Sequence, residues 1–157
     1  MQSRYFENVV AEVMNLTGQY SELALRRCLQ NSHMLSSDVS AAFDPNYASA
    51  FEKKNIAYLG HGMVFNKYTG SRGKSGSNDA CAEYIGALRK VMDDASVNWQ
   101  TAELGKVDQG VRFLNGMDVI DSGVALLNMH SPWEVSSKAD IYEAYRGYKA
   151  FQKAEWN

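Results

Sequence analysis

Apolar residues recur three and four positions apart in four stretches of the chain. This spacing predicts amphipathic helices over residues 5–14, 20–29, 78–95 and from 138 onwards. Gly18 separates the first two helices, which we expect to pack together. The last helix is expected to begin at an acidic capping box formed by Ser137 and Asp140. Its apolar side chains are expected to be buried; they are Ile141, Tyr142, Tyr145, Tyr148 and Phe151.

Short apolar runs between these helices predict strands. They cover residues 33–40, 56–59, 63–65, 97–104, 117–121 and 124–127. The Gly60-His61-Gly62 sequence between two of these runs indicates a hairpin, and Ser122-Gly123 indicates a bend between the last two. Because helices and strands alternate along much of the chain, we predict an α/β layered domain.

Composition and charge narrow the classes of function. The 157 residues suffice for one domain with a single core. A net charge of -2 and a pI near 5.9 do not indicate a nucleic-acid or anionic-membrane surface. We find neither a signal peptide nor a membrane-spanning run, so the expected location is the cytoplasm. Cys28 and Cys81 have no metal or redox spacing and are expected to be buried packing residues.

One histidine stands where an α/β sheet usually binds its ligand. His130 follows the apolar run 124–127, and open α/β sheets bind ligands at the carboxyl ends of their strands. Asp38, at the end of another apolar run, is its expected partner. His33 and His61 have no partner at a useful spacing and are expected to be surface or packing residues.

The glycine-rich stretch 68–78 matches a phosphate-binding loop only in part. Its Gly73-Lys74-Ser75 triplet precedes a predicted helix, but the full motif requires a glycine five positions before Gly73, where Tyr68 stands. We therefore expect a loop whose Arg72 and Lys74 can face an acidic or carboxylate-bearing ligand.

Four blocks of sequence carry a more specific signal. They are residues 36–47 (SSDVSAAFDPNY), 67–74 (KYTGSRGK), 103–110 (ELGKVDQG) and 129–134 (MHSPWE). In this order they closely resemble the aminopeptidase I and aspartyl aminopeptidase family of two-zinc metallopeptidases. The resemblance covers nearly the whole chain. It implies a three-layer α/β/α zinc-peptidase fold (phosphorylase/hydrolase-like), with residues 1–157 as the C-terminal third of the catalytic domain.

The resemblance also assigns roles to individual residues. It implies that Asp38 and His130 are metal ligands, one on each zinc, and that Lys67 and Lys74 lie near the substrate pocket. Asp108 is either a turn residue or a carboxylate that orients a ligand. Zinc suits these donors, although cobalt and manganese also accept them. In such sites the metal pair polarises the scissile carbonyl and activates water, and a separate glutamate is the general base.

The chain departs from the family pattern in two respects. The other metal ligands and the glutamate pair would precede the matched part, and relatives continue with more glycines after Gly110. Two ligands shared between two zinc ions fall short of the three that a catalytic zinc usually has. We therefore expect the isolated chain to lack aminopeptidase activity on peptides. The alternative is a truncated, non-catalytic relative that serves in assembly or binding, since the family forms homo-oligomeric cages of twelve subunits.

Overall fold

The computed structural model describes residues 4–68, 81–103 and 117–156. Their elements, in chain order, are α1 (Arg4–Leu16), α2 (Glu22–Gln30), β1 (His33–Ala41), the 3-10 helix η1 (Pro45–Ala50), β2 (Met63–Tyr68), α3 (Ala82–Asp94), β3 (Trp99–Glu103), β4 (Asp118–Leu127), β5 (Val135–Ser136) and α4 (Lys138–Lys153). The predicted α/β class and all four predicted helices are confirmed. Within this part of the chain, no helix is long and apolar enough to cross a membrane.

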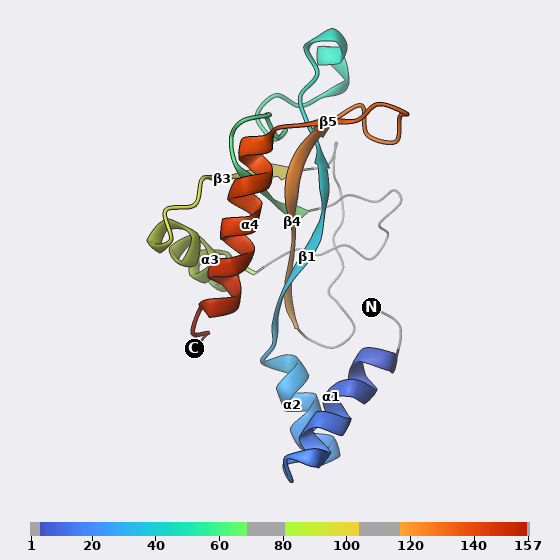
Figure 1. Cartoon of the computed structure of the whole chain (residues 1–157), viewed down its shortest axis with the longest axis vertical. Helices are drawn as coiled ribbons and strands as arrows, with labels where there is room; N and C mark the ends of the chain where they lie inside the picture. The colour runs from blue at the N-terminus through green and yellow to red at the C-terminus, as the bar shows by residue number, and fades with distance from the viewer. Residues whose placement is uncertain (1–3, 69–80, 104–116, 157) are drawn as a thin grey trace.

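A mixed sheet forms the centre of the molecule (Figure 1). Its strand order is β1-β4-β2-β3, with β5 paired to the end of β4. β1 is parallel to β4, β2 is parallel to β3, and β2 is antiparallel to β4. The carboxyl ends of β1 and β4 therefore lie at one edge of the sheet, and those of β2 and β3 lie at the opposite edge.

Helices α3 and α4 cover one face of this sheet (Figure 1). The core between them is built from alternate residues of the strands and from the inner sides of the helices; it contains Met63, Phe65, Tyr84, Leu88, Met92, Val97, Ile120 and Ala144. A smaller apolar cluster includes strand residues of the other face, Val64, Ala102 and Ala125. The described residues thus supply two of the three expected layers.

The buried side of α4 differs from the prediction. Ile141, Tyr142 and Tyr145 are exposed, at 53, 61 and 57%, so their predicted burial is wrong, whereas Tyr148 and Phe151 do pack against the core. The helix instead approaches the sheet through small residues. A Cβ atom on Gly147 would lie 2.5 Å from the sulfur of Met63, so this close packing requires glycine.

The carboxylate of Asp140 ties α4 to the loop before β2. This side chain is fully buried, and its two oxygens accept hydrogen bonds from the backbone N–H groups of Gly60 and Gly62, both at 2.8 Å. The Asp140 N–H donates to Ser137 Oγ at 3.4 Å, which confirms Ser137 as the N-cap of α4. The other half of the predicted capping box differs, because the Asp140 carboxylate binds the loop. The loop is therefore fastened to the helix and does not form the predicted hairpin, and residues 56–59 are not a strand.

The same side of α4 binds two further backbone groups. Glu143 accepts a hydrogen bond from the Asn98 N–H at 2.9 Å, and Arg146 donates one to the Ala95 carbonyl at 2.8 Å. Arg146 and Glu143 also form an ion pair at 3.1 Å. A row of polar side chains three residues apart thus holds the segments that lead into β2 and β3.

β4 is one continuous strand, so the predicted bend at Ser122-Gly123 is wrong. Gly123 lies level with Asp38 of β1 and Val64 of β2. A Cβ atom on Gly123 would come within 1.4 Å of the Asp38 carbonyl oxygen. Glycine is therefore needed at this position because the neighbouring strand approaches closely, and the strand continues through it.

Two smaller expectations are also corrected. Cys28 is exposed and not buried, because it faces outward on α2. Cys81 is partly buried and is itself the N-cap of α3, with its Sγ accepting from the Tyr84 N–H at 3.4 Å. The helix start predicted at residue 78 lies outside the described residues, and α3 begins at Ala82.

We expect Asp140→Ala to lower the free energy of unfolding by about 3 kcal/mol, because two backbone N–H groups lose a charged acceptor. Urea denaturation followed by circular dichroism measures the change. Asp94→Ala is the matched control: its carboxylate pairs with Lys90 on the exposed surface of α3, where such a pair contributes less than about 1 kcal/mol. Equal effects of the two substitutions would contradict the role given to Asp140.

A second stability test concerns Ser122, which is 1% exposed. Its hydroxyl has no hydrogen-bond partner within the described structure. Ser122→Ala should therefore raise the free energy of unfolding by about 1 kcal/mol. In contrast, Ser40→Ala should lower it, because buried Ser40 donates to Asn66 Oδ1 at 3.1 Å. Both values come from urea denaturation, and a loss of stability in Ser122→Ala would count against the assignment.

Candidate functional site

Asp38 lies within β1, three residues before its end, and not at the strand exit as predicted. Strand residues alternate between the two faces of a sheet. Because Leu35 packs against the α3 and α4 core, Asp38 belongs to the opposite face, together with Ser40. Its side chain is exposed, and its Oδ1 accepts a hydrogen bond from the Val39 N–H at 2.8 Å.

His130 lies in the loop that connects β4 to β5. β4 ends at Leu127, which pairs with Val135 of β5, so the loop leaves the sheet and returns to the same point. The His130 side chain is exposed. The prediction that β4 delivers this histidine to its carboxyl end is confirmed by the position of the loop.

The backbone of this loop is strained. Asn128 and His130 have φ angles of +55° and +67°, in the left-handed region that non-glycine residues rarely adopt. Such conformations cost about 1–3 kcal/mol each and cluster at functional sites. Glu134 stabilises the turn, because its Oε1 accepts a hydrogen bond from the His130 N–H at 2.6 Å. The chain therefore holds His130 in one backbone conformation at an energetic cost.

The register of β1 and β4 sets the spacing between the two predicted ligands. Asp38 is level with Gly123, and Leu127 lies four positions beyond Gly123, which corresponds to about 13 Å along the strand. The loop that carries His130 must therefore turn back over the sheet face of Asp38 for both side chains to bind adjacent metal ions. Their shared role as metal ligands stays a prediction.

The other predicted site residues are only partly covered by the structure. Lys67 is the fifth residue of β2 and follows Asn66, which pairs with Asp121 of β4. Lys74 and Asp108 lie outside the described residues. Their predicted roles in binding substrate and in orienting a ligand therefore stay predictions.

The donor chemistry of Asp38 and His130 fits zinc, which binds carboxylate oxygen and imidazole nitrogen. Within the described ranges, no group of three or more His, Cys, Asp or Glu side chains is arranged to hold a metal ion. Reasoning from the sequence missed Glu134, although its position four residues after His130 in the MHSPWE block is a signal that could have indicated the turn.

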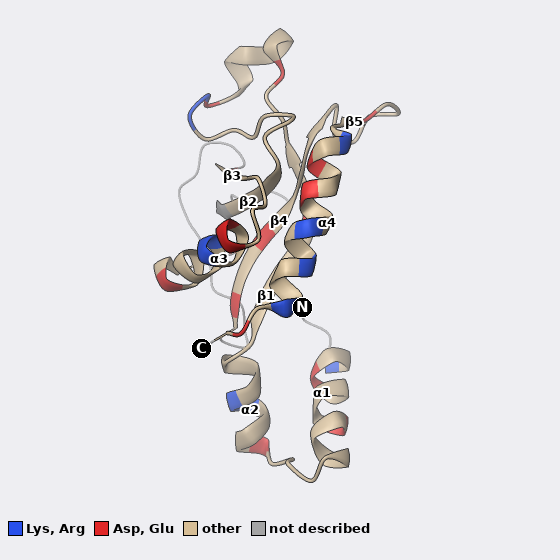
Figure 2. Cartoon of the chain, turned by 60° about the vertical axis from the view of Figure 1, so that its left-hand side comes forward, with Lys and Arg blue, Asp and Glu red and all other residues tan. Residues whose placement is uncertain are grey.

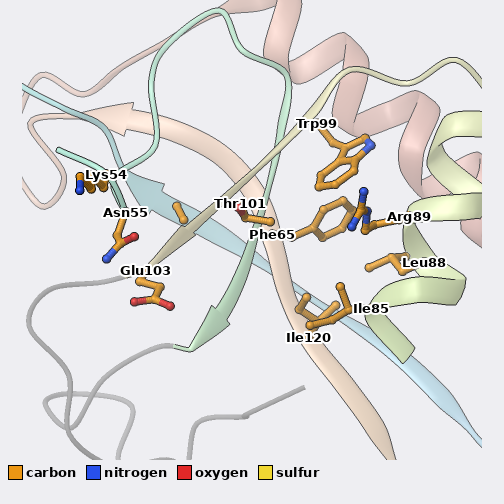
Figure 3. A pocket seen from close by; sticks show the side chains of 11 residues that line it. Lys54, Asn55, Phe65, Ile85, Leu88, Arg89, Trp99, Thr101, Glu103 and Ile120 are labelled. Carbon is orange, nitrogen blue, oxygen red and sulfur yellow. The ribbon is translucent and has the colours of Figure 1, made fainter. Parts of the chain in front are cut away.

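An apolar cavity of about 180 Å³ lies between α3 and the sheet (Figure 3). Neither Asp38 nor His130 lines it. The Arg89 guanidinium lies 5.5 Å from the centre of the Trp99 ring, where the cation can interact with the ring face. The other apolar lining residues are Phe65, Ile85, Leu88, Ala102 and Ile120.

A polar cluster around His33 is better explained by packing than by chemistry. The His33 ring stacks on Trp156, with 4.8 Å between ring centres, and its Nε2 lies 3.7 Å from Asp118 Oδ2. The Cys81 Sγ donates to the other Asp118 oxygen at 3.4 Å. Burial raises the pKa of the Cys81 thiol, which opposes its use as a nucleophile. Burial, followed by the Asp118 charge, also raises the pKa of Tyr84 well above its usual range.

Comparison with known proteins identifies the family. Residues 1–152 match the family model described as Aminopeptidase I zinc metalloprotease (M18). The chain belongs to the M18 family. The M18 resemblance predicted from the four sequence blocks is thereby confirmed.

Two M18 relatives are similar in both sequence and structure. A probable M18 family aminopeptidase 1 of Clostridium acetobutylicum is 66% identical over 158 residues, which cover 96% of this chain and 34% of that protein. The crystal structure of aminopeptidase I from this organism matches with a TM-score of 0.82, covering 98% of this chain and 34% of that one. The Thermotoga maritima M18 structure matches at 42% identity with a TM-score of 0.85, covering 95% and 35%.

The M18 chain described here spans about a third of the length of these curated relatives. A more distant structure, the mApe1 dodecamer of S. cerevisiae, shares the fold at 19% identity with a TM-score of 0.72, covering 96% of this chain and 33% of that one. The α/β sheet with its flanking helices is thus the M18 fold, present here in part.

The strain at His130 can be tested by glycine substitution. His130→Gly should raise the free energy of unfolding by about 1 kcal/mol, because glycine adopts a positive φ without strain. His61→Gly is the control: His61 lies outside the left-handed region, so added chain freedom should lower stability by about 0.5–1 kcal/mol. Urea denaturation of both variants decides the matter, and a loss of stability in His130→Gly would refute the strain argument.

Proposed function

We propose that this chain is the C-terminal third of the catalytic domain of a zinc-dependent aminopeptidase, which removes N-terminal residues from peptides. The observation that carries the proposal is the family match over residues 1–152 together with 66% identity to an M18 aminopeptidase. The family description includes zinc. The activity belongs to the complete enzyme, of which this chain covers about a third.

Asp38 and His130 are the residues that hold metal in this proposal. Each would donate to one ion of a zinc pair, and cobalt or manganese would accept the same donors. When bound, the zinc pair would polarise the scissile carbonyl and lower the pKa of a water molecule held at the site. Further donors and the general base would come from outside this chain.

The chain's own residues orient these donors. Glu134 fixes the backbone of His130 through a hydrogen bond of 2.6 Å. The position from which the imidazole extends, just beyond the end of β4, is therefore defined. Asp140 fixes the Gly60–Gly62 loop, whose end leads into β2 near the carboxyl ends of β1 and β4. In the same proposal Lys67 and Lys74 contact the substrate, and Asp108 orients a metal ligand.

A chimaeric enzyme tests the proposal directly. In it, this chain replaces the matching third of the Clostridium acetobutylicum relative. With zinc and an aminoacyl p-nitroanilide, the chimaera should be active, and Asp38→Ala or His130→Ala should lower kcat/KM by more than the roughly 10–100-fold typical of residues that only support a metal ligand. Zinc content per subunit, measured by atomic absorption, should fall in both variants.

His61→Ala serves as the control, because His61 is the other exposed histidine near this sheet edge and has no predicted metal role. It should retain activity and zinc. The isolated 157-residue chain should show no turnover with the same substrate. Turnover by the isolated chain, or full activity of His130→Ala in the chimaera, would overturn the proposal.

A second candidate is a non-catalytic M18 chain that acts in assembly or binding. The twelve-subunit assembly of the S. cerevisiae structure favours it. Light scattering of the purified chain distinguishes the two candidates. A defined homo-oligomer with zinc content near zero would favour assembly, whereas a monomer would count against it. Location in the cytoplasm stays a prediction from the sequence.

A further inference from the structure

Helix α1 has apolar side chains on two sides. Val10, Ala11 and Met14 are partly buried, and α1 contacts the neighbouring helix α2 (Figure 1). Another set is exposed and forms what we call the outer stripe: Phe6, Val9, Val13 and Leu16, with exposed fractions of 38, 43, 55 and 83%. No residue of α1 is fully buried.

The spacing of the outer stripe indicates helix packing. Phe6, Val9, Val13 and Leu16 follow one another at intervals of three, four and three residues, which is the seam that one helix presents to another. A helix that is apolar around most of its circumference is normally buried. A helix of this length is also marginal in water without packing partners. Both arguments require a partner for the outer stripe.

The described part of the chain offers no such partner. In both views, α1 and α2 form a hairpin that extends beyond the end of the sheet, and no described element other than α2 lies beside α1 (Figure 1, Figure 2). The α3 and α4 layer lies beside the sheet and away from this hairpin. The partner therefore comes from outside the described residues.

A second copy of the chain is a poor candidate for this partner. A helix of 13 residues is about 20 Å long and roughly 10 Å wide, so its stripe covers a few hundred Å² at most. A stable interface between separate proteins needs about 800 Å² from each partner. The stripe alone is too small, but it suits one contact within a larger folded domain.

We propose that the outer stripe of α1 is a contact surface for a helix of the M18 catalytic domain that this chain does not contain. About two thirds of the length of each relative lies outside the part that this chain matches, and this polypeptide is the occupant that the stripe fits. The inference rests on family membership and not on the metal chemistry. It is therefore measured without any assay of activity or zinc.

The test places the same substitutions in two contexts, the isolated 157-residue chain and the chimaera defined above. Val9→Asp puts a charge on the stripe, and Asn8→Asp puts the same charge next to it, on an exposed residue off the stripe. In the isolated chain neither should shift Tm by more than about 2 °C, because both side chains are accessible to water. In the chimaera Val9→Asp should lower Tm by at least about 5 °C, whereas Asn8→Asp should not.

Thiol labelling gives a second readout that does not depend on stability. A cysteine introduced by Val9→Cys should react with a maleimide at least about tenfold more slowly in the chimaera than in the isolated chain, because reaction then needs local opening. Asn8→Cys should react at similar rates in both contexts. Cys28, Cys81 and any cysteine in the part of the chimaera that comes from the relative are replaced by serine in all labelled proteins, so that only the introduced thiol reacts.

Each remaining outcome overturns the proposal. Equal effects of Val9→Asp in the two contexts mean that nothing covers the stripe in the larger protein. A chimaera that does not fold means that these surfaces do not fit the rest of the domain. If light scattering shows a dimer of the isolated chain that Val9→Asp converts to a monomer, the occupant is a second copy. A chimaera with a buried stripe but no peptidase activity would leave this inference standing and refute the proposed function alone.

Discussion

The arrangement of helix and sheet depends on the hydrogen bonds that the carboxylate of Asp140 accepts from the loop before β2. This carboxylate is fully buried, and a charge in that position is stable only with strong hydrogen-bond donors around it. Gly60 and Gly62 supply two backbone N–H groups at 2.8 Å. Both have positive φ angles, of +81° and +90°, so the loop adopts a shape that directs two amides toward one carboxylate.

These hydrogen bonds also explain which side of α4 faces the sheet. Asp140, Glu143 and Arg146 lie on one side of the helix and all bind backbone groups of the chain entering β2 and β3. Ala144 and Gly147 are the small buried residues of the same helix and allow close packing on the sheet. Polar hydrogen bonds and small side chains, and not the larger aromatic residues, decide which side is buried.

This arrangement shows what the sequence could predict and what it could not. Periodicity located all four helices and most strands. It failed for α4 because helical spacing predicted burial of Tyr142 and Tyr145, whereas the fully buried residue is Asp140, whose carboxylate binds a loop far away in sequence. It failed for Gly123 because the contact that requires glycine comes from a strand far away in sequence.

For the candidate site, the sequence indicated His130 by resemblance and by its place after an apolar run. The strained backbone of Asn128 and His130 and the bond from His130 to Glu134 became visible only in three dimensions, since backbone angles depend on how β4 and β5 close the loop. The strained backbone is compatible with the predicted role of His130, because strained conformations of this kind cluster at functional sites.

The parallel pairing of β1 with β4 has a consequence for how the chain folds. The two strands are separated in sequence by residues 42–117, yet they form the longest register in the sheet. Joining them requires closure of a long loop before any hydrogen bond between them forms, and such non-local pairing slows folding. The ribosome synthesises β1 before β4, so β1 lacks its parallel partner until β4 has been made. During that interval its unpaired backbone is a site where nascent chains can associate wrongly, so production of this chain should be sensitive to temperature and to chaperone supply.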